Sequence, residues 1–131
     1  MKTYQYQVIK YVHDHFTGEF VNMGIVLYNP ETHFLNCKFT DRSKRITSMF
    51  PGAEGPQVIK SLKNFSDPLL RKNEEIAGYP NSIKHLSDLT ETVLPKDGTV
   101  IQISPVQTAL DVDLELALDT LFYQLVEKYV H

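Results

Sequence analysis

The side chains most able to do chemistry gather in one short segment near the N-terminus. This segment contains His13, Asp14, His15 and Glu19, and Asn22 follows it closely. Neutral imidazoles beside carboxylates are common ligands of zinc and similar metals, and histidines two residues apart on an extended segment share a face. A small enzyme with a site built from His13, Asp14, Glu19 and Asn22, with or without a metal, is therefore one hypothesis.

The alternative is that the same segment is an ordinary turn. Polar turns often use His and Asp to bond their own backbone, and a metal site needs a third ligand that only the fold can place. We favour the turn for His13, Asp14 and His15, and we expect neither a bound metal nor a cofactor. The sequence has no GxGxxG, GxxxxGK[ST], GxSxG or HExxH motif, so the prediction leans away from catalysis.

A second pattern disturbs the apolar segment that follows this turn. Its members are Gly18, Glu19, Asn22 and Gly24, and two of them, Asn22 and Gly24, lie inside an otherwise apolar strand. On a two-residue period, Asn22 and Gly24 share a face with Phe20, and Glu19 shares the other face with Val21, Met23 and Ile25.

Two interpretations of this pattern remain open. In the functional one, Gly24 lets a ligand or another backbone approach, while Asn22 and Glu19 offer hydrogen bonds to it. In the structural one, which we favour, Gly24 marks a β-bulge or a tight contact with a helix, and Asn22 bonds to a neighbouring loop.

A cluster of basic residues lies further along the chain, at Lys38, Arg42, Lys44 and Arg45. These four side chains form a candidate basic patch, and nucleic-acid binding is our third hypothesis. The formal net charge of the whole chain is -3, which gives no general attraction to phosphate. The cluster also follows the aromatic-rich strands instead of alternating with them, so we consider nucleic acid an unlikely partner.

Cys37 is the single cysteine, which excludes a disulfide within the chain and a zinc site of several thiolates. Its neighbours on the same side of a predicted strand are Leu35 and Phe39, so we expect an inert, buried thiol. The N-terminus lacks the pattern of a signal peptide, and no apolar run approaches the roughly 20 residues that span a bilayer. We expect a cytoplasmic location with no membrane association.

The elements that position these residues follow from the periodicity of the sequence. Alternation over Thr3–Val12, Phe20–Tyr28 and His33–Phe39 predicts a three-stranded antiparallel meander with its first turn at His13–Gly18. A fourth short strand is predicted at Thr99–Ser104.

Helical spacing occupies most of the rest of the chain. A short helix is predicted around Ile46 to Phe50, a second one over Val58 to Phe65 that Pro68 interrupts, and a third after a Ser82 cap. The acidic stretch Asp111 to Glu115 is expected to begin a long C-terminal helix, the longest of the protein, which covers one face of the sheet. The predicted fold is α+β, and 131 residues suffice for a single domain, residues 1–131.

Residues Gly18–Pro30, read GEFVNMGIVLYNP, resemble the signature of the bacterial domain-of-unknown-function 3037 family. Tyr4–Val12 is similar to the first strand of that family, and Ile101–Thr108 followed by Leu121–Val126 is similar to its closing segment. The resemblance implies a stand-alone bacterial protein with no established catalytic activity, whose relatives often accompany a HipA-like kinase.

The function that we predict from the sequence is a non-catalytic interaction or regulatory module. Its surface is expected near Thr17–Gly24, and a HipA-like kinase is the partner that the resemblance implies. The oligomeric state and the order of the strands remain open at this point.

Overall fold

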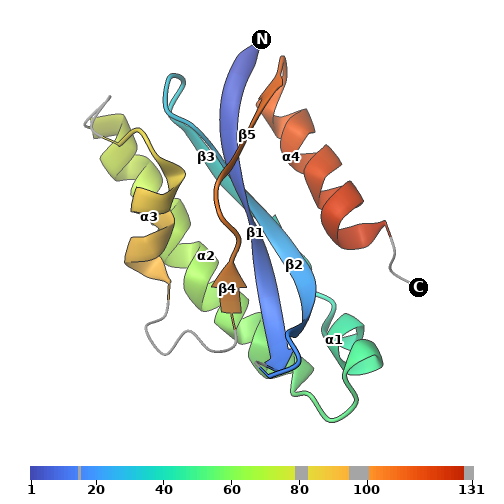
Figure 1. Ribbon diagram of the computed structural model, residues 1–131. Coiled ribbons are helices and arrows are strands. Elements are labelled where there is room, and N and C mark those ends of the chain that lie inside the picture. The colour runs from blue at the N-terminus through green and yellow to red at the C-terminus, as the bar shows by residue number, and fades with distance from the viewer. Residues whose placement is uncertain (15, 79–82, 95–100, 129–131) are drawn as a thin grey trace.

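The computed structural model describes residues 1–14, 16–78, 83–94 and 101–128. Within these residues an antiparallel five-stranded sheet carries helices on both faces (Figure 1), so the predicted α+β fold is confirmed. The strands are β1 (Lys2–Asp14), β2 (Glu19–Asn29), β3 (Phe34–Phe39), β4 (Ile101–Ile103) and β5 (Gln107–Asp111). The helices are α1 (Ser43–Met49), α2 (Gly55–Gly78), α3 (Leu86–Val93) and α4 (Leu114–Phe122), and α4 continues into the π-helical turn η1 (Tyr123–Glu127).

The long strand β1 lies inside the sheet, in the order β3-β2-β1-β4, and β5 pairs with β1 as well. β1, β2 and β3 form the predicted meander. On its other side β1 pairs first with β5, where Tyr4 lies opposite Ala109, and then with β4, where Ile9 lies opposite Ile103. β5 was not predicted, because its short polar sequence lacks the apolar alternation that marks a strand.

Ser104 joins β4 to β5 across a break in the edge of the sheet. Its backbone N–H donates to the carbonyl of Val8 (2.9 Å), and its hydroxyl accepts the N–H of Val8 (2.8 Å). The predicted strand Thr99–Ser104 is thus present from Ile101, and its first two residues lie outside the described ranges.

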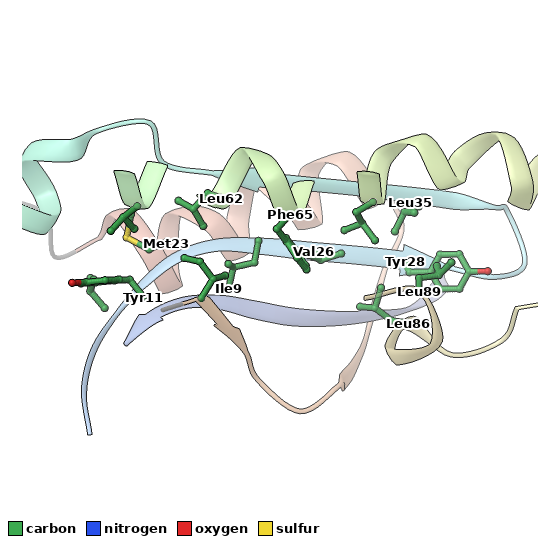
Figure 2. Packing of buried hydrophobic residues seen from close by; sticks show 14 of the residues in the cluster. Ile9, Tyr11, Met23, Val26, Tyr28, Leu35, Leu62, Phe65, Leu86 and Leu89 are labelled. Carbon is green, nitrogen blue, oxygen red and sulfur yellow. The ribbon is translucent and has the colours of Figure 1, made fainter. Parts of the chain in front are cut away.

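The larger core lies between the sheet and helices α2 and α3 (Figure 2). Its fully buried side chains come from both layers and include Ile9, Met23, Val26, Leu62, Phe65, Leu69 and Leu86. A second, smaller core fills the other face, where α4 packs on the sheet. The predicted cover of one face by the C-terminal helix is therefore present, and the opposite face is covered too.

Two glutamines on β1 hold α3 against the sheet. The side-chain oxygen of Gln5 accepts the N–H of Leu86 at the start of α3 (2.7 Å), and its amide nitrogen donates to the carbonyl of Lys84 (2.8 Å). Gln7 accepts a hydrogen bond from the hydroxyl of Thr90 (2.7 Å) and donates to the carbonyl of Ser104 (2.9 Å). The predicted helix cap, Ser82, lies outside the described residues, and the helix begins only at Leu86.

Helix α2 differs from the prediction, because it runs without a break through Pro68 to Gly78. Proline removes one helical N–H donor and usually ends or kinks a helix. Here Leu62 and Phe65 before the proline and Leu69 and Ile76 after it are all buried in the same core. Burial of one continuous apolar stripe on both sides of Pro68 outweighs the missing bond.

The C-terminal helix is shorter than predicted, and α2 is the longest helix of the described chain. α4 has 9 residues, and η1 adds 5 in π-helical geometry, in which the N–H of Lys128 bonds to the carbonyl of Tyr123 (2.7 Å). The helix begins within the predicted acidic stretch, where Asp113 caps α4: its carboxylate accepts the N–H of Leu116 (3.1 Å). None of the helices in the described ranges combines the length and hydropathy needed to cross a bilayer.

Candidate functional site

Asp14 builds the turn between β1 and β2. One carboxylate oxygen accepts the N–H groups of Phe16 (2.8 Å) and Thr17 (3.3 Å), and the carbonyl of Asp14 accepts the N–H of Gly18 (2.8 Å). Gly18 has a φ of 74°, a conformation in which a Cβ is strained. Asp14 and Gly18 therefore act as turn formers here, and His15 lies outside the described residues.

His13 takes part in an aromatic cluster beside this turn. Its ring stacks on Phe50, with centroids 4.4 Å apart and planes 8° apart, and its Nδ1 is 2.9 Å from the hydroxyl of Tyr11. Tyr11 and Phe50 belong to the core on the α2 face of the sheet. The imidazole is thus directed to that face, where it holds the end of α1 against the hairpin.

Asn22 is directed to the opposite face. Its side-chain amide donates to the carbonyl of Leu125 in η1 (3.0 Å), and its Oδ1 is buried with no hydrogen-bond partner among the described residues. Glu19 lies opposite Asp14 in the β1–β2 register and is exposed. Since His13 and Asn22 lie on different faces of the sheet, the structure does not bring His13, Asp14, Glu19 and Asn22 into one pocket.

Gly24 is the point where β3 approaches β2 most tightly. A Cβ at this position would lie 2.7 Å from the carbonyl oxygen of Lys38 and 2.7 Å from the Cβ of Phe39. Between Gly24 and Asn22 the pairing with β1 shifts by one residue, so Met23 forms a β-bulge. The β-bulge of the structural interpretation is present, but the tight contact of Gly24 is with strand β3 and not with a helix, and Asn22 bonds to η1 and not to a loop.

The bulge also changes which residues face which core. Val21 and Met23 pack on the α2 side, whereas Ile25 packs on the α4 side. The predicted alternation had placed Ile25 with Val21 and Met23, because a strict two-residue period does not anticipate an inserted residue.

The hairpin end carries exposed apolar side chains that the sequence patterns did not single out. We define the hairpin-end surface as three exposed side chains: Phe16 in the β1–β2 turn, Phe20 near the start of β2 and Met49 at the end of α1. The β1–β2 turn and α1 lie at the same end of the molecule (Figure 1). The ring of Phe16 is fully exposed, and Phe20 is 46% exposed with the ammonium of Lys10 4.5 Å from its ring centroid. The signal in the sequence is an aromatic residue inside an otherwise polar turn.

The four basic residues of the candidate patch have different surroundings. Lys38 pairs with Asp119 of α4 (3.1 Å) and lies 5.0 Å from the ring centroid of Phe122. Arg45 is half-buried, and this burial lowers the pKa of its guanidinium while the charge of Glu127 opposes the shift. Arg42 and Lys44 are exposed at the start of α1, whereas Lys38 is paired and Arg45 is half-buried, so the structure does not present all four as one cationic surface.

Cys37 has the environment of an unreactive thiol. It packs against the core beside Leu35 and Phe39, as the sequence predicted. Burial and, to a lesser extent, the charge of Asp67 raise the pKa of the thiol from 9.0 to about 12. At neutral pH the thiolate needed for nucleophilic attack is therefore scarce.

Two cavities of the described chain lie away from most of the predicted site residues. One of about 200 Å³ adjoins Tyr11 and Glu54, and another of about 430 Å³ lies at the far end of the sheet, beside Lys2 and the start of α4. Within the described ranges, no three His, Cys, Asp or Glu side chains gather closely enough to hold a metal ion.

The comparisons with known proteins agree with the resemblance seen in the signature segment. No curated protein and no solved structure shows a significant similarity to this chain. The sequence profile described as "Protein of unknown function (DUF3037)" matches residues 6–126, from the middle of β1 into η1. The match covers most of β1, the strands β2 to β5 and the helices α1 to α4, so the chain belongs to the domain-of-unknown-function 3037 family.

Proposed function

We propose that this protein is a non-catalytic interaction module that binds a partner through the hairpin-end surface. The observation that carries the proposal is the fully exposed ring of Phe16 on a turn whose backbone is held by Asp14. Burial of a side chain of this size contributes roughly 1.5–3 kcal/mol of favourable free energy. Folding does not bury Phe16, so this contribution is available to partner binding.

The turn is well suited to present an anchor residue. Asp14 fixes the backbone at Phe16 and Thr17 before a partner binds. The loss of conformational entropy on binding is therefore small. Aromatic side chains are enriched among the residues that dominate interface energies. Phe20 and Met49 supply further apolar area, and Lys10 adds a positive charge beside Phe20.

The first partner to test is a HipA-like kinase, since the family resemblance implies that such kinases accompany these proteins. In this proposal the module binds the kinase in the bacterial cytoplasm and regulates it without chemistry of its own. The separation of His13 from Asn22 across the sheet supports a binding role over the small enzyme. The dispersed surroundings of Lys38 and Arg45 favour it over nucleic-acid binding.

The proposal is tested by titrating the purified full chain against a purified HipA-like kinase from the same host. Wild type should form a stoichiometric complex, and the double variant Phe16→Ala, Phe20→Ala should bind at least about tenfold more weakly. Tyr123→Ala is the matched control, because Tyr123 is an exposed aromatic residue in η1 on the α4 side. Equal affinities of wild type and the double variant would rule out the hairpin-end surface, and absence of any complex would rule out the kinase.

A further inference from the structure

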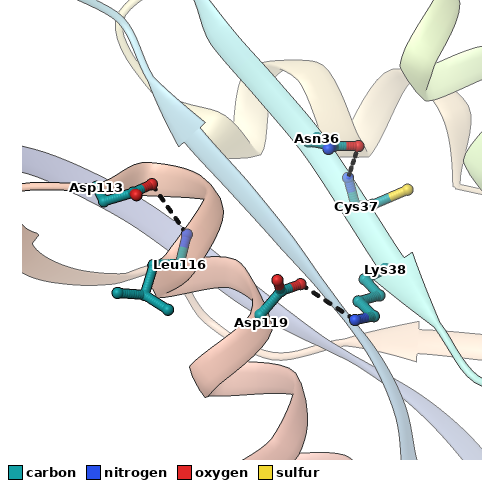
Figure 3. Close-up of polar contacts among 6 residues, drawn as sticks. All are labelled: Asn36, Cys37, Lys38, Asp113, Leu116 and Asp119. Atoms are coloured by element: carbon teal, nitrogen blue, oxygen red, sulfur yellow. Dashed lines mark hydrogen bonds and ion pairs between the residues drawn. The ribbon is translucent and has the colours of Figure 1, made fainter.

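The two edges of the sheet differ in how many of their outward-pointing backbone groups are hydrogen-bonded by the rest of the chain. At the β3 edge, the side-chain oxygen of Asn36 accepts the N–H of Cys37 (2.9 Å; Figure 3). The side-chain amide of Asn73 in α2 donates to the carbonyl of Leu35 (3.2 Å). Leu35 and Cys37 are two residues apart, so their backbone groups point to the same side of β3. Side chains of the protein itself therefore occupy outward-pointing groups of this edge.

The β5 edge has no such cover within the described residues. The bond from the N–H of Ser104 to the carbonyl of Val8 shows that the even-numbered residues of β1 direct their backbone groups toward β4 and β5. Since Tyr4 of β1 pairs with Ala109 of β5, the backbone groups of Ala109 point toward β1. Those of its neighbours Thr108 and Leu110 then point outward, away from the sheet. In the described part of the chain, no hydrogen bond reaches the N–H or the carbonyl of Thr108 or Leu110.

β5 also lacks the features that protect a free edge. Natural sheets discourage edge pairing with lysines, prolines, bulges or a covering element. Within β5 the only charged residue is Asp111, and there is no lysine or proline. Leu110 is 59% exposed, the exposed Val112 follows directly after the strand, and Leu116 is exposed in the first turn of α4. The edge therefore offers an open row of backbone donors and acceptors with apolar side chains beside it.

We propose that β5 is a dimerisation strand that pairs antiparallel with β5 of a second copy of this chain. Unpaired strand backbone is complemented by another extended strand, and a two-fold axis makes the same open edge available on both sides. Because β5 carries almost no charge, two copies of the strand can pair without repulsion between like charges. An antiparallel register centred on any residue from Gln107 to Leu110 places Asp111 opposite an uncharged residue of the other copy.

Such a dimer forms one continuous antiparallel sheet from two copies. Thr108 and Leu110 of each copy donate and accept the new backbone hydrogen bonds, and the side chain of Leu110 becomes covered by the second strand. The hairpin-end surface lies at the other end of β1, so this pairing is independent of the proposed partner binding.

The experiment is sedimentation velocity of the full chain over a range of concentrations. Wild type should change from the mass of one chain to that of two as concentration rises. Thr108→Pro removes an outward N–H that β1 does not use, so its thermal midpoint should stay near that of wild type while the dimer weakens by about tenfold or more. Leu110→Lys should weaken the dimer, because it brings two positive charges together at the paired edges. Met49→Lys is its control: Met49 on α1 is similarly exposed but lies outside the paired edge, so the dimer should be unchanged.

Three outcomes would overturn the proposal. The first is a wild-type chain that stays monomeric at every concentration. The second is a dimer that forms equally well in folded Thr108→Pro and Leu110→Lys. The third is a monomer whose β5 edge binds an extended peptide of another protein.

Discussion

Gly24 and Phe39 face each other across β2 and β3 so closely that a Cβ on Gly24 would lie 2.7 Å from the Cβ of Phe39. The contact brings β3 against the bulged part of β2, where Met23 is inserted. The carbonyl of Met23 accepts the N–H of Thr40 (2.8 Å), which holds the chain as it leaves β3 for α1. The close approach at Gly24, in the signature segment of the family, thus helps to fix where the chain enters α1.

Gly24→Ala should destabilise the protein by about 1–3 kcal/mol, because the added methyl group meets backbone as well as a side chain. Urea unfolding monitored by circular dichroism measures the change. Gly18→Asn, at a position where a Cβ meets nothing within 4 Å, measures separately the cost of a side chain at a positive φ. A Gly24→Ala variant as stable as wild type would show that β3 can move away without loss.

Asp14→Ala and Asp14→Asn separate a turn former from a catalytic or metal-binding carboxylate. The alanine variant loses both bonds to the N–H groups of Phe16 and Thr17 and should be less stable by about 1 kcal/mol. The asparagine variant keeps the accepting oxygen and should unfold nearly like wild type. If partner binding or any activity depends on the negative charge, Asp14→Asn will lose it while remaining fully stable, and the turn alone will not explain Asp14.

Thr90→Val should destabilise the protein by about 1–3 kcal/mol. Thr90 is completely buried and Gln7 is only 3% exposed, so the variant leaves the side-chain oxygen of Gln7 buried without its donor. Gln7→Met should also be destabilising, because it leaves the carbonyl of Ser104 without the amide of Gln7.

The double variant Gln7→Met, Thr90→Val completes a cycle that is measured by urea unfolding. It should lose clearly less stability than the sum of the single variants, because both partners of one buried bond are removed together. Strict additivity would mean that Gln7 and Thr90 are not coupled.

Stability should fall as the pH rises from about 9 toward 12, in part because of Cys37. The pKa of its thiol rises from 9.0 to about 12 on folding, so the unfolded chain loses its proton first. This contribution is fully present below pH 9 and is lost as the pH approaches 12. Burial also raises the pKa of Tyr4, Tyr11 and Tyr28 above 10.0, which acts in the same direction.

Cys37→Ala isolates the thiol from these tyrosines. The variant should show a shallower loss of stability across this pH range than wild type, whereas Tyr28→Phe should flatten only the part above about pH 10. Denaturant midpoints measured at several alkaline pH values test this, and parallel curves for wild type and Cys37→Ala would contradict a buried, protonated thiol.

Local patterns were sufficient wherever one residue type determines the backbone around it. The alternating strands β1 to β3 follow from the two-residue period, and the start of α4 follows from Asp113, whose carboxylate bonds the N–H of Leu116. The turn at Asp14 is likewise a local matter, because an aspartate bonds the N–H groups of the next residues. The burial of Cys37 could be predicted for the same reason, from its apolar neighbours on one face.

Other features depended on contacts between distant parts of the chain. Pro68 stays inside α2 because the core holds apolar residues on both sides of it, and β5 is a strand because β1 supplies its hydrogen bonds. The candidate site was separated by such contacts as well: His13 stacks on Phe50 on the α2 face, whereas Asn22 bonds to the carbonyl of Leu125 in η1 on the opposite face.

The sequence by itself therefore determined the fold class, the family and the turn at Asp14, since each depends on residues adjacent in the chain. Only the tertiary structure decided which side chains meet and which remain exposed. Exposure of Phe16 and Leu110 depends on what the rest of the chain leaves uncovered, and no local pattern contains that information.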